Sequence, residues 1–179
     1  MTGSTYIEFD QARTKSMNLI RNNENPVAGL LFITGIHTGL RISDLLSLTF
    51  GDLRKDSIII KEQKTGKTRD IEIHDSIKTA MSYFPDEEYP HSFKAFRSQK
   101  NCVMSSRHVN RLIKKYFKGN RISSHSLRKT FGRRVYDMNG KCEEALNYLS
   151  EIFNHRDIST TRRYLGIRQE EIKNIYLNL

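Results

Sequence analysis

Residues 123–131, Ser-Ser-His-Ser-Leu-Arg-Lys-Thr-Phe, place a histidine and an arginine three positions apart at the start of a predicted helix. Ser123 or Ser124 can cap this helix. The spacing puts His125 and Arg128 on one helix face, and the helix N-terminus adds free N–H groups and partial positive charge. These features suit a bound phosphate oxygen, with Arg128 donating in a fork and His125 donating or shuttling a proton. Taken alone, the pattern is also typical of a solvated basic helix face.

Upstream, a second arginine follows a glycine-containing turn, Thr38-Gly39-Leu40-Arg41. Gly39 lets the backbone turn tightly, so that the Arg41 guanidinium can approach a ligand closely. The competing interpretation is a surface arginine paired with Asp44, three residues further along the same predicted helix.

Between these stretches lies the clearest β pattern, in which residues 57–61 and 70–73 form β-branched runs around the turn Lys64-Thr65-Gly66-Lys67. A lysine on such a hairpin can donate a proton to a leaving oxygen if nearby cations lower its pKa. Lys64 is the candidate, and Lys61 and Lys67 are local competitors. An ordinary exposed turn lysine is the alternative.

Downstream, His155 and Tyr164 stand nine residues apart. Asn154 can adopt a left-handed conformation and so present His155 at a sharp turn, and Asp157 or Ser159 can cap the helix that carries Tyr164. A phenol is a poor nucleophile because its ordinary pKa is about 10. We expect surrounding cations to stabilise the phenolate. A loop histidine and a packed tyrosine are the alternatives for each residue alone.

The rest of the chain is predicted to be helical. Asn25 and Pro26 can start one helix, and residues 41–51 are expected to form another. Further helices are expected at 9–21, after Asp75, from Ser105 or Ser106 to Gly119, and at about 141–153, 159–165 and 169–178. The fold class is therefore mainly α with a small antiparallel β-sheet, an α+β domain.

The helix that begins near Ser105 is strongly amphipathic, with an apolar face and a basic face. We expect the basic face to contact DNA through Arg107, Arg111 and Lys114. Thirty Lys and Arg residues against twenty Asp and Glu give a formal charge of +10, as in proteins that neutralise phosphates. A basic protein without a nucleic-acid partner is the alternative.

Four ordered segments resemble the catalytic domain of the tyrosine recombinase (phage integrase) family. Residues 38–45 resemble its first arginine box and 124–131 its HxxR box, while Lys64 occupies the place of its hairpin lysine. Residues 153–164 resemble its final His-to-Tyr box, with Phe-Asn-His where Leu-Gly-His is usual. The resemblance spans roughly residues 9–179.

The resemblance implies a DNA breaking and rejoining enzyme that needs no metal, cofactor or ATP. Tyr164 would attack the scissile phosphate, forming a 3′-phosphotyrosyl bond and freeing a 5′-hydroxyl. Arg41 and Arg128 would hold the non-bridging oxygens. Lys64 would protonate the departing oxygen, His125 would act as acid and base, and His155 would donate a supporting hydrogen bond.

The family also implies double-stranded DNA as the partner and a homotetramer on paired sites, with the isolated domain able to be a monomer. Ile172, Ile175 and Leu179 provide an apolar face for docking of the C-terminal helix on a neighbour. We expect residues 1–179 to be a single catalytic domain without the family's N-terminal core-binding domain. The rival functions are a type IB topoisomerase and a catalytically idle DNA-binding module.

The remaining sequence features bear on location. Cys102 and Cys142 have no metal-ligand or disulfide spacing, which favours a reducing compartment. No apolar run approaches the roughly 20 residues of a membrane span, and residues 1–6 do not resemble a secretion signal. We therefore expect the bacterial cytoplasm or nucleoid, or the cytoplasm of a phage-infected host.

Overall fold

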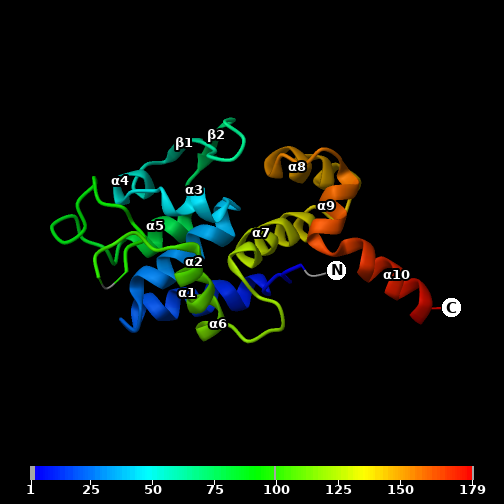
Figure 1. The fold of residues 1–179 in the computed structure, drawn as a ribbon, viewed down its shortest axis with the longest axis horizontal. Coiled ribbons are helices and arrows are strands. Elements are labelled where there is room, and N and C mark those ends of the chain that lie inside the picture. The colour runs from blue at the N-terminus through cyan, green and yellow to red at the C-terminus, as the bar shows by residue number, and fades with distance from the viewer. Residues whose placement is uncertain (1–2, 99, 179) are drawn as a thin grey trace.

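A computed structural model describes residues 3–98 and 100–178 (Figure 1). This part of the chain contains ten helices and one two-stranded antiparallel sheet. The fold class predicted from the sequence, mainly α with a small sheet, is confirmed.

The first two helices follow their sequence signals closely. They are α1 (Phe9–Arg21) and α2 (Pro26–Thr38). The Asn25 side chain accepts a hydrogen bond from the Ala28 amide at 3.2 Å, and Pro26 occupies the first turn, where its missing N–H costs nothing. Helix α2 is buried along most of its length and packs against α1, α5 and α7. It is the centre of the larger hydrophobic core.

The next segment differs from the prediction of one helix over residues 41–51. The structure divides it into α3 (Ile42–Leu46) and α4 (Phe50–Leu53). Thr49 and Asp52 form a reciprocal capping box, in which the Asp52 carboxylate accepts from the Thr49 amide at 2.9 Å. This box begins a new helix at Phe50 and interrupts the earlier one.

The sheet consists of β1 (Ser57–Lys61) and β2 (Thr68–Glu72), with Ser57 opposite Glu72 and Lys61 opposite Thr68. Strand β2 begins two residues earlier than predicted. Ile58, Ile60 and Ile71 face the core, whereas Ile59 is exposed, as the two-residue period of a strand requires. The hairpin therefore has one buried and one exposed face.

Helices α5 (Asp75–Met81) and α6 (Ser106–Tyr116) flank a long irregular segment. The predicted cap of α5 was Asp75, but His74 is the N-cap residue and its ring nitrogen accepts from the Ser76 amide. Ser105 caps α6 as predicted. Helix α6 ends at Tyr116, before the predicted stop at Gly119, because the chain becomes extended at the buried residue Phe117.

The last four helices are α7 (Ser124–Met138), α8 (Glu143–Phe153), α9 (Ile158–Leu165) and α10 (Ile167–Leu177). Asn154 has the predicted left-handed conformation, with φ of 53°, and Asp157 caps α9. Figure 1 shows α7 running from the larger group of helices toward α8 and α9, while α10 projects at one end of the molecule. In the described residues no helix is long and apolar enough to cross a bilayer.

Helix α7 connects two hydrophobic clusters. Its residue Leu127 belongs to the large cluster around α2. Tyr136, further along α7, belongs to a smaller cluster with Leu149, Phe153 and Leu165 of α8 and α9. The face of α7 between these two residues therefore lies at the boundary of the clusters, which is where Arg128 projects.

Gly39 provides a test of how closely α2 and α7 approach each other. Its φ is 60°, and an added Cβ would overlap the ring of Phe131. A left-handed L residue costs roughly 1–2 kcal/mol, and overpacking adds about 1–3 kcal/mol. Gly39→Ala should therefore reduce the free energy of unfolding in urea by about 2–5 kcal/mol.

Gly66→Ala is the matched control, because Gly66 also has a positive φ, 69°, but its added Cβ meets nothing within 4 Å. It should reduce the free energy of unfolding only by the cost of a left-handed backbone, roughly 1–2 kcal/mol. Equal losses for the two variants would contradict the proposed overlap with Phe131.

Candidate active site

The six predicted catalytic residues come from five parts of the fold. Arg41 precedes α3, and Lys64 lies in the β1–β2 turn. His125 and Arg128 lie on the first turns of α7, His155 follows α8, and Tyr164 is on α9. The structure brings Arg41, Arg128, His155 and Tyr164 around one buried residue, Phe153.

Phe153 is fully buried and contacts most of the site. Its carbonyl accepts a hydrogen bond from Arg41 Nη2 at 2.9 Å. The Arg128 guanidinium carbon lies 4.4 Å from its ring centroid, and the Tyr164 ring meets it edge-on at 5.5 Å. The aromatic ring thus positions Arg128 and the phenol of Tyr164 by cation–π attraction and packing, while the backbone carbonyl of the same residue holds Arg41. The sequence analysis placed Phe153 only within the final family box and gave it no role.

Arg41 does not pair with Asp44, which was the alternative considered from the sequence. Its Nη1 donates to Glu62 Oε2 at 2.6 Å. Asp44 is buried and instead accepts from the Gln63 amide at 3.0 Å. Glu62 was not singled out in the sequence, because a single glutamate beside a strand has no distinguishing pattern.

Arg128 is buried, with 4 % of its surface exposed. Its Nη1 donates to the carbonyl of Gly39, while its buried Nη2 has no partner among the described residues. Burial, together with the charges of Arg41 and Arg69, lowers the pKa of Arg128 to about 10. The side chain remains charged at neutral pH and keeps an unused donor at the centre of the site.

Tyr164 differs from one expectation. Burial raises the pKa of its hydroxyl to about 12, and the opposing effects of Arg128 and Arg41 do not compensate. Arg128 and Arg41 do stabilise the phenolate, as expected from the sequence, but loss of hydration penalises the anion more, so the net pKa rises. The hydroxyl is buried and has no hydrogen-bond partner among the described residues.

The two histidines differ in position, because His155 is half-buried against the tyrosine ring whereas His125 is exposed at the start of α7. His155 Nδ1 lies 2.9 Å from Thr161 Oγ1, and its ring lies 5.2 Å from that of Tyr164. Burial and the charges of Arg128 and Arg41 lower the pKa of His155. Partial burial and the charges of Lys129, Arg128 and Lys64 lower that of His125. Both imidazoles are therefore mainly neutral at pH 7, with one donor and one acceptor nitrogen each.

The three lysines of the hairpin differ in their contacts. Lys67 Nζ donates to Asn154 Oδ1 at 2.6 Å and thereby links the hairpin to the α8–α9 loop. Lys64 is exposed, and its charge is one of those that depress the pKa of His125. Lys61 is exposed at the end of β1. Lys67 is thus occupied by a structural contact, while Lys64 lies on the side of His125.

Lys129 is a further cation beside the tyrosine. Its ammonium lies 4.8 Å from the centroid of the Tyr164 ring and donates to the carbonyl of Ser4. The N-terminal segment is thereby connected to the site. Among the described residues no group of three or more His, Cys, Asp or Glu side chains could hold a metal ion.

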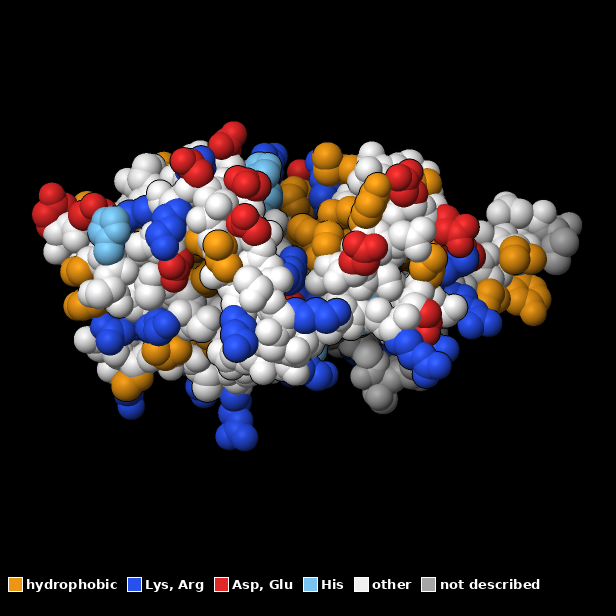
Figure 2. All heavy atoms as spheres, turned by 90° about the horizontal axis from the view of Figure 1, so that it is seen from above, with side chains coloured by type: hydrophobic (Ala, Val, Ile, Leu, Met, Phe, Trp, Pro, Cys, Tyr) orange, Lys and Arg blue, Asp and Glu red, His pale blue; other side chains and the backbone are white. Residues whose placement is uncertain are grey.

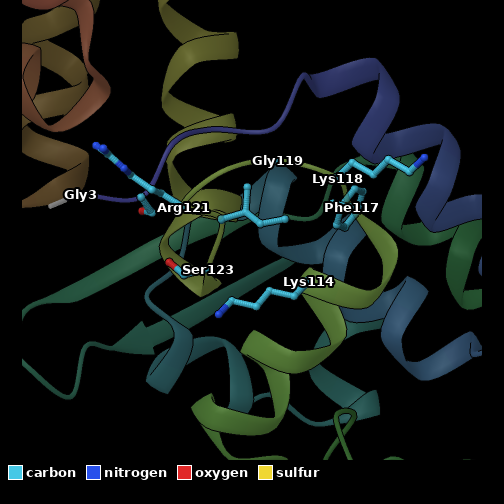
Figure 3. A pocket seen from close by; sticks show the side chains of 9 residues that line it. Gly3, Lys114, Phe117, Lys118, Gly119, Arg121 and Ser123 are labelled. Atoms are coloured by element: carbon cyan, nitrogen blue, oxygen red, sulfur yellow. The ribbon is translucent and has the colours of Figure 1, made fainter.

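The predicted DNA-contact residues Arg107, Arg111 and Lys114 are all exposed on α6, while Val109, Leu112 and Ile113 of the same helix are buried. At the end of this helix Figure 3 shows Lys114, Lys118 and Arg121 around a hollow, which is lined on one side by Gly3. The hollow has a volume of about 730 Å³. Its cations extend the basic face of α6 toward the start of α7.

Comparison with known proteins gives the family. The model of the phage integrase family matches residues 9–171. The chain belongs to the phage integrase family. It is 35% identical over 160 residues to the probable integrase/recombinase YoeC of Bacillus subtilis, covering 86% of this chain and 85% of that protein.

Other relatives are tyrosine recombinases. XerC of Leptospira interrogans is 26% identical over 183 residues, and the match covers 95% of this chain but 54% of XerC. The chain thus spans about half the length of that relative. As a member of this family it is a DNA strand-breaking and rejoining enzyme of the site-specific recombinase class. The topoisomerase and idle-module alternatives are not favoured.

The fold agrees with the family. A crystal structure of XerA recombinase superposes with a TM-score of 0.69 at 18% identity, covering 98% of this chain and 65% of XerA. A lambda integrase dimer bound to a COC′ core site gives 0.66 at 16% identity, covering 92% and 49%. The arrangement of helices and hairpin is that of a tyrosine recombinase catalytic domain.

The raised pKa of Tyr164 predicts a pH-dependent stability. Between its ordinary value of 10.0 and about 12 the folded protein keeps the phenol proton that the unfolded chain loses. This contribution is present below pH 10 and is lost as pH rises toward 12, by at most about 1.4 kcal/mol per pH unit. In urea unfolding at pH 9–11, Tyr164→Phe should therefore lose stability less steeply than the native chain.

Tyr176→Phe is the control for this measurement, because Tyr176 is 77 % exposed. Its stability should follow that of the native chain across the same pH range. If Tyr164→Phe also follows the native curve, the hydroxyl is not desolvated in the folded protein.

Proposed function

We propose that Tyr164 is the nucleophile that attacks a DNA phosphodiester, with Arg41, Arg128, Lys64, His125 and His155 completing the site. The observation that carries this assignment is the buried phenol beside two guanidinium groups, one of which has an unpaired buried N–H. A phosphate placed there would accept a hydrogen bond from that N–H, and its negative charge would offset the positive charge of the arginines.

The proposed reaction conserves the phosphodiester bond energy. The Tyr164 oxygen forms a bond to the 3′-phosphorus as the bond from phosphorus to the 5′-oxygen breaks. Arg41 and Arg128 stabilise the charge that develops on the non-bridging oxygens. Attack by the 5′-hydroxyl of another strand reverses the step and releases Tyr164, so no nucleotide cofactor is consumed.

Proton transfer is needed because Tyr164 is protonated in the free protein. His125, whose lowered pKa leaves it neutral, can accept the phenol proton. Lys64 supplies a proton to the departing 5′-oxygen, and His155 donates a hydrogen bond to the phosphate. The ring of His155 already meets that of Tyr164, and its Nδ1 is held by Thr161, so only Nε2 faces other partners.

We place double-stranded DNA across the basic face of α6. Arg107, Arg111 and Lys114 are exposed there, and the formal charge of the chain is +10. Lambda integrase, which has a similar fold, has been crystallised bound to DNA. Exposed cations that approach phosphates release counterions and so drive binding.

The proposed assembly on paired sites is a homotetramer joined through α10. Ile172, Ile175, Tyr176 and Leu177 are exposed on this helix, and Figure 2 shows hydrophobic side chains at its projecting end. An apolar helix face of this kind is costly to leave in water. Leu179, the third residue predicted for this contact, lies outside the described residues.

A covalent adduct tests the nucleophile. The target is first selected from a duplex library by retention on the native chain after a denaturant wash, and is then nicked beside the cleavage point to trap the product. The native chain should give a denaturant-resistant protein–DNA band on a gel, and Tyr164→Phe should give none because the attacking oxygen is missing.

Tyr148→Phe is the matched control, since Tyr148 is exposed and hydrogen-bonds Glu144. It should form the adduct at the native rate. An adduct that persists in Tyr164→Phe would refute the assignment of the nucleophile.

The basic face is tested by the salt dependence of binding. Replacing Arg107, Arg111 and Lys114 together by Ala should weaken DNA binding and make the slope of log K against log salt shallower by about 2.7, at roughly 0.9 per phosphate contact. Fluorescence anisotropy with a labelled duplex measures both quantities.

The control removes the same charge from scattered exposed positions, Lys55, Lys141 and Lys173. It should change the slope much less. Equal changes in the two triple variants would show that net charge, and not the face of α6, governs binding.

A further inference from the structure

Glu62 is the buried carboxylate that neutralises part of the cluster of cations. Its side chain is 1 % exposed. Oε2 accepts from Arg41 Nη1 at 2.6 Å and from Thr65 Oγ1 at 2.7 Å. Oε1 accepts from Arg69 Nη1 at 3.3 Å. The carboxylate therefore joins Arg41 to the hairpin turn through Thr65 and to strand β2 through Arg69.

The backbone of the same residue closes that turn. The Glu62 amide donates to the Lys67 carbonyl at 2.9 Å, and the Gly66 amide donates to the Glu62 carbonyl at 2.8 Å. Lys64 lies inside the loop that these two bonds close. Glu62 thus helps to hold two of the proposed catalytic residues. Its side chain binds Arg41, and its backbone closes the turn that carries Lys64.

The ionised state of Glu62 follows from its neighbours. Burial favours the neutral acid, but hydrogen bonds from Thr65, Arg41 and Arg69 outweigh burial, and the pKa lies below its ordinary value. A charged acceptor holds a guanidinium more strongly than a neutral one. Removing its charge while keeping its shape is therefore an informative change.

Arg41 is fixed at both terminal nitrogens. Nη1 is held by Glu62, and Nη2 donates to the Phe153 carbonyl. A free arginine side chain samples many rotamers, so two contacts that define the guanidinium plane reduce the entropy lost when a phosphate binds. Only one of these two acceptors, Glu62, carries a negative charge.

We propose that Glu62 is a positioning residue for strand cleavage, which acts by fixing the Arg41 guanidinium against the scissile phosphate. This inference rests on the proposed function of Tyr164 and Arg41. It assigns to Glu62 no contact with DNA.

The test compares Glu62→Gln with the native chain on three versions of the nicked substrate. The first has an ordinary scissile phosphodiester. The second has a methylphosphonate there, which lacks the charged oxygen that Arg41 neutralises. The third has a sulfur in place of the 5′-bridging oxygen, which makes a leaving group that needs no protonation by Lys64.

On the ordinary phosphodiester, Glu62→Gln should reduce the rate of adduct formation by about tenfold or more, the effect expected for loss of a charge-assisted hydrogen bond. On the methylphosphonate its rate should approach that of the native chain. On the sulfur substrate the deficit should persist. DNA affinity should not fall, because a negative charge has been removed.

Other outcomes overturn the proposal. Rescue by the sulfur substrate alone would place the effect of Glu62 on Lys64, and an equal deficit on all three would show no specific link to Arg41. A native rate on the phosphodiester would give Glu62 no role. If the native chain itself forms no adduct, the proposed function fails, and this result is distinct from all of the others.

Two further variants keep the test decisive. Thr65→Val removes one hydrogen bond to Glu62 from a partly exposed turn position. It should reduce the rate of adduct formation less than Glu62→Gln does, with the same recovery on the methylphosphonate and the same deficit on the sulfur substrate. If Glu62→Gln fails to fold by thermal melting, the pattern for Thr65→Val decides. Glu72→Gln removes an exposed charge from β2 and should cleave all three substrates at native rates.

Discussion

The burial of Arg128 between the Gly39 carbonyl and the Phe153 ring is the constraint around which the molecule is arranged. A guanidinium that is 4 % exposed has lost most of its hydration, so the protein must supply polar and aromatic partners. Gly39 ends the central helix of the large cluster, and Phe153 ends the last helix of the small cluster before the Tyr164 segment. One cation thus joins the two cores at the site.

The electrostatics of the site follow from this concentration of positive charge. The buried Glu62 carboxylate offsets Arg41 and Arg69. Burial and the remaining excess of positive charge lower the pKa of both histidines, while desolvation keeps Tyr164 protonated. In the free protein the proposed nucleophile, Tyr164, is therefore uncharged, and the arginines proposed to bind phosphate are only partly neutralised. A bound phosphodiester would supply the missing charge, which couples activation of the proposed chemistry to DNA binding.

Local signals predicted most of the elements because their causes are local. The caps Asn25, Ser105 and Asp157 and the left-handed Asn154 each act within a few residues. The prediction failed at residues 41–51, where the capping box of Thr49 and Asp52 competes with helix continuation. For the site, the resemblance to family motifs identified Arg41, Lys64, His125, Arg128, His155 and Tyr164. Glu62 lies in no recognisable motif, and its partner Arg41 is 21 residues away.

The sequence by itself determined the residue types, their order and most of the elements that carry them, because helix periodicity, capping signals and family motifs each lie within short stretches of chain. Only the tertiary structure decided which of these groups share a buried volume, and hence their protonation. Tyr164 is the clearest case, since the same phenol would titrate near 10 in water but has a pKa of about 12 here. Desolvation depends on how the consecutive helices α7, α8 and α9 pack against one another in three dimensions, and the pattern within any one of them does not encode this packing.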